Sequence, residues 1–469
     1  MRAGARPAPH RKTMRAPRGR DYPRAFLGAP MPAQRSVTKW LERAPAPVFT
    51  AFAVIAAFST YFCMYAFRKP FAVGSYKGMV ALPLLPALDL KSLYIIAQVL
   101  GYCASKFLGI KIVSEMPPER RALAILACIG VSEAALVLFG LAPAPYAAVF
   151  LALNGLPLGM VWGLVFGFLE GRRVSDLLGA GLCASFIVAS GFVKTIGKIT
   201  LGWGVPEVWM PAVTGALFFP PLLLSVWMLA QIPPPSVDDE ALRTRRAPMD
   251  RAARRAFVLA NAGGLATLVL GYVVLTAYRD FRDNFAREIW DALGYTDQPA
   301  ILTTAEIPVA IGALLSVAVM IGIRNNRTAL AAIHGVMIAG AALAGLSTAL
   351  YQAGVIGPVA WMISVGLGLY VGYVPYNCVL FDRLIAAVGS VATAGFLITA
   401  ADAFGYLGSV ALLLYKSFGQ AKRSWLEFFL GFSYATALVC GALFAASAAY
   451  FWLRTRGPSA AARPAALDA

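Results

Sequence analysis

The sequence predicts an all-α polytopic membrane protein, with twelve transmembrane helices arranged as two pseudo-symmetric six-helix bundles. Of its 469 residues, 59% are hydrophobic and only 14% are charged, whereas soluble domains average about 45–50% apolar and about 25% charged residues. A soluble protein of this length would need two or three domains, each with enough polar sequence to cover its core. That polar sequence is missing, because long apolar runs recur from Val48 to Leu453.

Each apolar run is long enough to cross a bilayer. A transmembrane helix needs about 20 mostly apolar residues, and the runs are continuous rather than alternating, which excludes a closed β-barrel. In chain order the predicted spans are 48–73, 92–113, 121–141, 146–169, 177–199, 210–231, 257–281, 304–323, 329–350, 357–381, 391–415 and 427–453.

Polar segments flank and divide these spans. We expect 1–46 to be a disordered cytoplasmic arm, because it is rich in Arg and Pro and poor in acidic residues. A polar cytoplasmic linker, 232–256, separates an N-terminal six-helix bundle, 47–231, from a C-terminal one, 257–453. A cytoplasmic tail, 454–469, completes the predicted organisation.

The basic residues predict the orientation of the chain. There are 41 Lys and Arg residues against 23 Asp and Glu, a formal net charge of +18. With the N-terminus inside, most basic residues outside the spans fall on the cytoplasmic side, as the positive-inside rule requires. We therefore expect a bacterial-type inner (plasma) membrane protein with both termini in the cytoplasm. Its partner surface is the lipid bilayer and not nucleic acid, which needs a basic face on a soluble fold.

Few residues suit metal or cofactor chemistry. The six cysteines are scattered singly in apolar segments and are typical of small buried hydrophobic residues. The two histidines, His10 and His334, are too far apart in the sequence to indicate a metal site. No nucleotide-binding GxxxxGK[ST] loop is present. We expect no enzyme activity, no catalytic residues, no metal and no cofactor.

Several basic residues lie inside the predicted spans or at their ends. A charge at the bilayer centre costs at least roughly 2.5–3.5 kcal/mol on insertion scales, so it normally faces a wet cavity or a partner. Snorkelling from a helix end is the alternative. The eight residues are Arg68, Lys69, Lys106, Lys111, Lys194, Lys198, Arg279 and Arg282.

The first two spans each carry a polar stripe. In span 48–73, Tyr61, Tyr65 and Arg68 are spaced 0, 4 and 7, so they share one helix face. In span 92–113, Tyr102 and Lys106 share a face by the same spacing. Such a stripe indicates either a surface that lines a pore or a hydrogen-bonded seam between helices.

The seventh span repeats the pattern of the first. Tyr272, Thr276 and Arg279 again fall at 0, 4 and 7. A second alignment, in which the RDNF sequence at Arg282 matches RKPF at Arg68, nominates Arg282 instead. We prefer Arg279 because it lies deeper and shares a face with Tyr272. Two acidic residues, Asp280 and Asp283, are positioned to neutralise either arginine and would make this helix an ion-pair lock.

Three further polar residues are candidates. Tyr373 lies on one face of span 357–381 together with Tyr370 and Asn377. Two acidic residues are candidates for coupling or proton relay: Asp402 in span 391–415 and Glu133 in span 121–141. A hydrogen-bonded structural role is the alternative for Glu133.

This organisation resembles the major facilitator superfamily. Arg68, Lys69, Pro70 and Phe71 resemble the RKNF signature of the organophosphate:phosphate antiporters, which include the glycerol-3-phosphate and hexose-phosphate transporters. The stretch YCASKFLGIKIVSE, residues 102–115, is similar to that family's YGxSKFxxGxxSD. The clear match covers about the first third of the chain. The family's histidine in the fifth helix has no counterpart, so the chain is identified as a divergent member.

The resemblance implies a binding mode. Arg68 and an arginine of the seventh helix would bind a phosphate from opposite halves, while Lys69 and Lys106 would add positive potential. The two halves would rock around this site to give alternating access.

These observations predict a secondary active transporter of a small anionic solute, an organophosphate or a carboxylate. Exchange for inorganic phosphate and coupling to protons through Glu133 or Asp402 are both open at this point. A transporter-like receptor or sensor, which binds such a solute without net transport, is the alternative.

Overall fold

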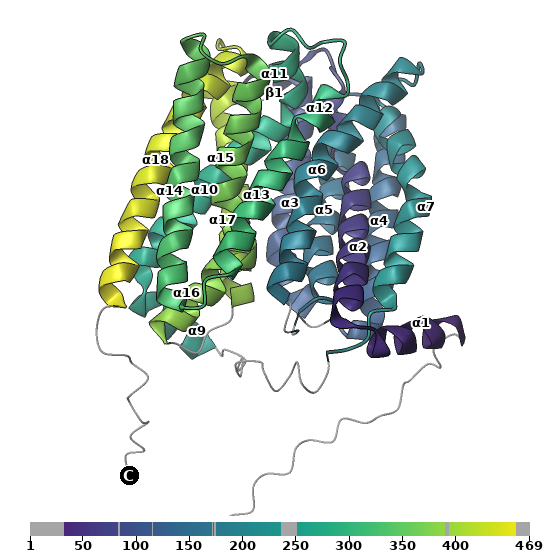
Figure 1. Ribbon diagram of the computed structural model, residues 1–469. Coiled ribbons are helices and arrows are strands. Elements are labelled where there is room, and N and C mark those ends of the chain that lie inside the picture. Colours follow the sequence, from purple (N-terminus) through teal and green to yellow (C-terminus); the bar gives the residue numbers. More distant parts are fainter. Residues whose placement is uncertain are drawn as a thin grey trace, which may run out of the picture.

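The computed structural model describes residues 32–82, 85–114, 116–170, 172, 175–235, 251–389 and 394–455. Long helices run side by side along one axis of the molecule (Figure 1). In these residues, eleven helices are long and apolar enough to cross a membrane. The predicted span 92–113 corresponds to α3 (Leu90–Ser114), a further helix of 25 residues that is not among those eleven. The chain is a multi-pass membrane protein, and the predicted fold class is confirmed.

The first half of the chain provides one bundle. In its described residues it contains α3, further α-helices, two short 3-10 turns (η) and two strands. In chain order the elements other than α3 are α1 (Pro32–Arg43), α2 (Ala46–Met64), η1 (Tyr65–Phe67), η2 (Pro70–Val73), β1 (Met79–Leu82), β2 (Leu85–Asp89), α4 (Pro118–Leu141), α5 (Ala148–Phe166), α6 (Ser175–Gly202) and α7 (Met210–Ala230). The strands form an antiparallel hairpin in which Met79 pairs with Asp89.

The second half provides the other bundle. Its elements are α9 (Arg251–Ala260), α10 (Ala262–Asn284), α11 (Ala286–Ala292), α12 (Ile301–Thr304), α13 (Glu306–Ile321), α14 (Asn326–Gln352), α15 (Pro358–Cys378), α16 (Leu380–Val388), α17 (Ala394–Leu414), the π turn η3 (Tyr415–Gly419) and α18 (Trp425–Arg454).

Local start signals determine where several helices begin. Proline stands in the first turn of α2, α4 and α15, where its missing N–H costs nothing. The Asn325 side chain accepts hydrogen bonds from two backbone N–H groups at the start of α14. Ser424 and Glu427 form a capping box at the start of α18.

The helices pack by the same pattern in both halves. In the first half, α2 packs against α6 and α7, and α5 packs against α3 and α4. In the second half, α10 packs against α17 and α18, and α15 packs against α13 and α14. The main contacts between the halves follow the same symmetry, because α3 packs against α17 and α13 packs against α6. This repeated pattern is the predicted pseudo-symmetry.

The structure differs from the predicted segment boundaries in three places. The last part of the arm predicted to be disordered, 1–46, forms α1, which lies across one end of the bundle (Figure 1). The end of the predicted linker, 232–256, forms the start of α9. The predicted span 304–323 begins earlier, with the single turn α12. Residues 1–31, 236–250 and 456–469 lie outside the described residues, and the domain boundaries stay a prediction.

We call the end of the bundle that carries α1 and the end of α18 the terminal face (Figure 1). The loop face, at the other end, carries the hairpin, α11 and α12. Both described ends of the chain lie at the terminal face, as an even number of spans requires.

Candidate functional site

A central cavity lies between the two halves. Seven of its eleven lining residues are aromatic, and three more are charged. The first half contributes Tyr61, Tyr65, Tyr102, Lys106, Trp162 and Phe186, and the second half contributes Arg279, Tyr373, Asn377, Asp402 and Tyr406. The centre of a water molecule has about 20 Å³ of space here, which is room for about one water. The cavity as it stands is therefore too small for an organic ligand.

A break in the first predicted span positions Arg68 beside this cavity. The α-helix ends at Met64 and short 3-10 turns follow, and Pro70 has no N–H with which to continue the helical hydrogen bonds. The break leaves backbone carbonyls without helical donors. Asn154 of α5 donates to the carbonyl of Phe67 at 2.9 Å, and Gln98 of α3 donates to the carbonyl of Arg68 at 2.8 Å.

Two buried amides therefore hold the backbone at the break. Gln98 also donates to the Oδ1 atom of Asn154 at 2.9 Å, which joins the two amides into one network. Both side chains are fully buried. A buried carbonyl without a donor costs roughly 1–3 kcal/mol, so these amides stabilise the geometry that directs Arg68 away from α2.

Arg68 is a buried cation among aromatic rings. Its side chain is 2% exposed. The guanidinium carbon lies 3.7 Å from the ring centre of Tyr102 and 5.7 Å from that of Tyr406, distances at which a cation is attracted to the ring face. Among the described residues, no carboxylate lies within 4.0 Å of Arg68, and its Nε atom has no hydrogen-bond partner.

Arg279 approaches the same rings from the other half. It donates hydrogen bonds to the hydroxyl groups of Tyr373 and Tyr406, the latter at 2.8 Å. It also forms an ion pair with Asp280 at 3.0 Å. Of the two arginines weighed from the sequence, Arg279 lines the central cavity and Arg282 does not.

An ion pair crosses between the halves at the same cavity. Lys106 of α3 lies 2.7 Å from the carboxylate of Asp402 of α17. Asp402 also accepts a hydrogen bond from the Tyr272 hydroxyl at 2.8 Å. The Tyr272 and Tyr373 rings stack with their centres 4.9 Å apart.

A second group of charges lies between the halves, away from the central cavity. Lys69 lies 2.5 Å from the carboxylate of Asp283, and Lys194 of α6 contacts the other oxygen of the same carboxylate. Arg282 pairs with Glu306 of α13 at 2.8 Å. These five residues are the Asp283 cluster.

Further polar contacts join the halves near the loop face. Lys91 pairs with Glu288, and Lys198 lies 3.5 Å from a carboxylate oxygen of Asp291. Arg287 donates to the backbone carbonyl of Val73 at 2.6 Å. Together with the Asp283 cluster, these contacts close the loop-face side of the interface.

The structure brings most of the predicted binding residues together. Arg68, Tyr65, Tyr102, Lys106, Arg279, Tyr373 and Asp402 surround the central cavity, and Tyr272 hydrogen-bonds into it. Lys69 and Arg282 belong to the Asp283 cluster instead. Glu133 lies outside both groups, where α4 meets α7: a Cβ atom on Gly215 would stand 2.3 Å from its carboxylate.

Tyr406 shares a helix face with Asp402 by its spacing in the sequence. In the structure it accepts a hydrogen bond from Arg279, and its ring centre lies 5.7 Å from the guanidinium carbon of Arg68. The sequence did not single out one important residue, Glu306. Glu306 pairs with Arg282, and an acidic residue at the start of an apolar run was its only signal. Lys194, for which snorkelling was an alternative, is 3% exposed and bonded to Asp283.

Two solved structures have a similar fold. The D-xylose–proton symporter has a TM-score of 0.57 and 14% sequence identity, over 88% of this chain and 99% of that chain. A mutant of the nucleoside transporter NupG has a TM-score of 0.51 and 16% identity, over 84% of this chain and 99% of that chain. These similarities show that the chain shares the fold of these two proteins. The resemblance to the major facilitator superfamily and the narrower one to organophosphate antiporters stay predictions.

The sequence itself matches one family. No curated protein matches it. A family model matches residues 70–454, which covers most of the chain and all but the first of the predicted spans. The chain belongs to the family described as a family of unknown function (DUF5690).

Proposed function

We propose that this protein is a secondary active transporter that moves a small organic anion, an organophosphate or a carboxylate, across the membrane by alternating access. The observation that carries the proposal is the convergence of two buried arginines from opposite halves. Arg68 and Arg279 lie 5.7 and 5.5 Å from the ring centre of the same tyrosine, Tyr406.

The charges at the central cavity favour an anionic ligand. Three cations, Arg68, Lys106 and Arg279, face two carboxylates, Asp280 and Asp402. The carboxylates pair with Lys106 and Arg279, so that Arg68 has no carboxylate within ion-pair distance in the described part of the chain. Keeping a buried charge without a partner is costly, and a bound anion would supply that partner.

The type of cation also fits phosphate or carboxylate recognition. A guanidinium group presents several N–H donors in a plane and binds two oxygens of one anion at once. Lysine acts as a point charge, so Lys106 would add attraction without fixing the orientation of the ligand. The tyrosine hydroxyl groups around Arg279 hold its guanidinium in place before the ligand arrives.

The closed arrangement supports movement between two open states. The central cavity has room for about one water, so an organic anion enters only when the halves separate. The ion pairs near the loop face join side chains from opposite halves and are able to break and re-form as the halves rock. Pseudo-symmetric halves around a site at mid-depth are typical of alternating access.

A ligand screen tests this proposal. We expect a raised melting temperature of the purified protein with one class among inorganic phosphate, glycerol-3-phosphate, sugar phosphates and dicarboxylates. A ligand at a hundredfold excess over its Kd stabilises a protein by about 2.7 kcal/mol. Stabilisation by uncharged sugars or by cations, with no effect of any anion, would overturn the charge argument.

A flux measurement separates the transporter from the sensor alternative. Protein reconstituted in liposomes should exchange the stabilising anion across the bilayer. Protein that binds this anion but shows no exchange in either direction would instead support a receptor or sensor that uses the transporter fold.

A further inference from the structure

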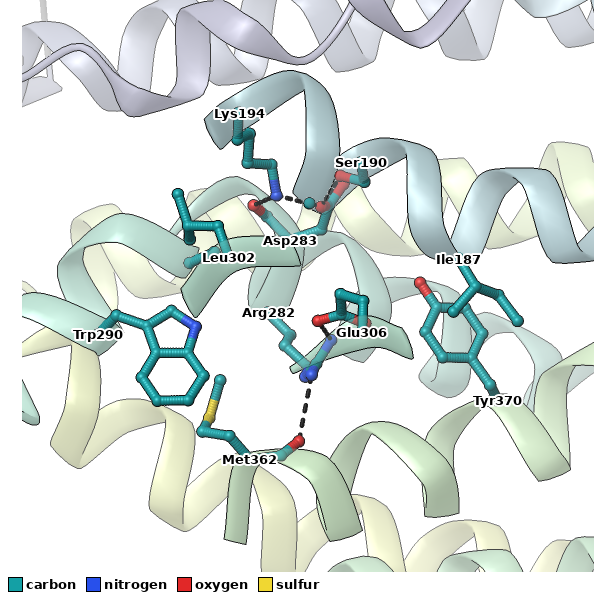
Figure 2. A pocket seen from close by; sticks show the side chains of 12 residues that line it. Ile187, Ser190, Lys194, Arg282, Asp283, Trp290, Leu302, Glu306, Met362 and Tyr370 are labelled. Carbon is teal, nitrogen blue, oxygen red and sulfur yellow. Dashed lines mark hydrogen bonds and ion pairs between the residues drawn. The ribbon is translucent and has the colours of Figure 1, made fainter. Parts of the chain in front are cut away.

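A second cavity lies between the halves, apart from the central one. Its polar lining comes from Ser190 and Lys194 of α6, Arg282 and Asp283 of α10, and Glu306 of α13. Figure 2 shows Lys194 and Ser190 directed at Asp283 from one side, and Arg282 between Glu306 and the backbone carbonyl of Met362. The centre of a water molecule has about 10 Å³ of space here, close to the minimum for one water.

The two carboxylates of this cavity have different surroundings. Asp283 is fully paired: one oxygen accepts from Lys194 and Ser190, and the other lies 2.5 Å from Lys69. Two lysines on one carboxylate strongly favour its charged form. Asp283 therefore holds the halves together as a fixed charge.

Glu306 is only half satisfied. Its Oε1 atom pairs with Arg282 at 2.8 Å, but its Oε2 atom is buried and has no hydrogen-bond partner among the described residues. The Nε atom of Arg282 also has no partner. A buried carboxylate oxygen without a donor is costly, and binding a proton removes that cost by removing the charge.

The two carboxylates near the central cavity suit a proton less well. Asp402 has both a lysine and a tyrosine hydroxyl as partners. Asp280 also has an oxygen without a partner among the described residues, but its side chain is only 3% exposed and lines neither cavity. The Glu306 side chain is 12% exposed and lines the second cavity. The groups that face Glu306 from the surrounding helices are Arg282 and Asp283 of α10, Lys194 of α6 and Tyr370 of α15.

We propose that this cavity is a proton-binding site. Glu306 takes up the proton, and its ion pair with Arg282 is then lost. A proton from water forms an O–H bond with the Glu306 carboxylate, and Arg282 keeps its own protons but loses its counter-ion. The cluster of three cations and two carboxylates then has one carboxylate fewer. Loss of that negative charge would raise the attraction of the cluster for an anion, so the site would couple proton uptake to anion transport. This coupling role rests on the proposed function.

The packing beside Glu306 links the site to movement of the halves. A Cβ atom on Gly191 of α6 would stand 2.0 Å from the backbone carbonyl of Leu302, so α6 and α12 pack backbone to backbone here. Separation of the halves at this point exposes Glu306 to water, and closure buries it again. The carboxylate therefore exchanges protons in one state and retains them in the other.

Infrared difference spectroscopy on the purified full-length protein tests the site without any ligand. We expect the C=O stretch of a buried protonated carboxyl group to grow as the buffer is acidified. Glu306→Gln should lose this band, and Glu306→Asp should keep it at a changed frequency. The matched control Glu133→Gln, a half-buried carboxyl outside both cavities, should keep the Glu306 band.

A second variant distinguishes a titrating site from a structural pair. Arg282→Gln removes the cation that opposes protonation, so the midpoint of the band should move to higher pH by about 1–3 units. The proposal is overturned if the wild-type protein has no titrating buried carboxyl, or if the band persists in Glu306→Gln. An unchanged pH midpoint of the carboxyl band in Arg282→Gln also overturns it. If Glu306→Gln does not fold, an unchanged frequency of the carboxyl band in Glu306→Asp overturns the proposal instead. Arg68→Lys should keep the band, so loss of anion transport and loss of the proton site are separate results.

Discussion

Arg68, beside the central cavity, and Arg279, which lines it, approach the same tyrosine ring from opposite halves, yet only Arg279 has a carboxylate partner within 4.0 Å among the described residues. Their positions depend on different devices. A break in the first span directs Arg68, whereas tyrosine hydroxyls and Asp280 hold Arg279 on an unbroken helix. The unequal pairing is what gives the cavity its unbalanced positive charge.

The amides that support the helix break are expected to matter for stability and for the site. Gln98→Leu removes the donors to the Arg68 carbonyl and to Asn154. We expect a loss of about 1–3 kcal/mol in the free energy of unfolding, because buried acceptors lose their donors. Thermal melts followed by circular dichroism measure it, and the exposed Gln352→Leu is the matched control. Equal melting temperatures for the two variants would contradict the role of Gln98.

Variants of the Lys106–Asp402 ion pair should distinguish its effect on stability from its effect on transport. Asp402→Asn leaves Lys106 buried without a counter-ion, and breaking a buried pair in this way costs about 3–5 kcal/mol. The double variant Lys106→Met with Asp402→Leu should recover most of that stability, because no buried charge remains. Anion uptake in liposomes should stay low in both proteins. Full uptake by the double variant would show that the pair is purely structural.

Acid should weaken a contact near the loop face. The Glu207 carboxylate accepts hydrogen bonds from the backbone N–H groups of Ser75 and Tyr76 at 2.8 and 2.9 Å, and Tyr76 has an unusual positive φ of 40°. Burial alone would raise the pKa of Glu207, but the hydrogen bonds from Ser75 and Tyr76 outweigh it, and the pKa is lowered.

The direction of that pKa change fixes the expected pH dependence. A carboxylate with a lowered folded-state pKa contributes stability above its unfolded value of 4.5 and loses it as the pH falls through the folded value. The melting temperature of the wild type should therefore fall more steeply than that of Glu207→Gln as the pH is lowered below about 4.5. Parallel curves for the two proteins would show that the contact has no such role.

A native cysteine pair offers a test of the movement. The sulfur atoms of Cys183 on α6 and Cys378 on α15 lie 3.3 Å apart, and the helices belong to opposite halves. Oxidation with copper phenanthroline should remove two of the six free thiols and stop anion exchange, and a reductant should restore both. Cys183→Ser should be insensitive to the oxidant. Unchanged exchange in a cross-linked protein would mean that the halves do not separate at this point.

The sequence was sufficient for the fold because hydropathy and helix length decide which segments cross a membrane. Predicted spans such as 121–141 and 210–231 agree with α4 and α7 to within three residues. Arg279 lines the central cavity and Tyr272 hydrogen-bonds to Asp402 beside it, as is expected of residues spaced 0, 4 and 7 on one helix face.

Partners from distant segments were beyond what spacing can predict. Lys69 follows Arg68 directly but belongs to the Asp283 cluster, because the break at Pro70 ends the helical repeat. Glu306 was missed because its significance comes from Arg282, which lies on another helix. The arm before α2 was predicted to be disordered from its composition, yet α1 buries Leu41 to 2% exposure against the rest of the molecule.

The replacement of each cavity arginine by lysine is the most direct test of the central claim, that two arginines from opposite halves bind one transported anion. Lysine keeps the charge but loses bidentate geometry, and a hydrogen bond to a charged group contributes about 1.5–3 kcal/mol. Uptake of the stabilising anion into liposomes should therefore fall roughly 10- to 100-fold in Arg68→Lys and in Arg279→Lys. The exposed Arg120→Lys should keep the wild-type rate. Full uptake by both cavity variants would contradict the account.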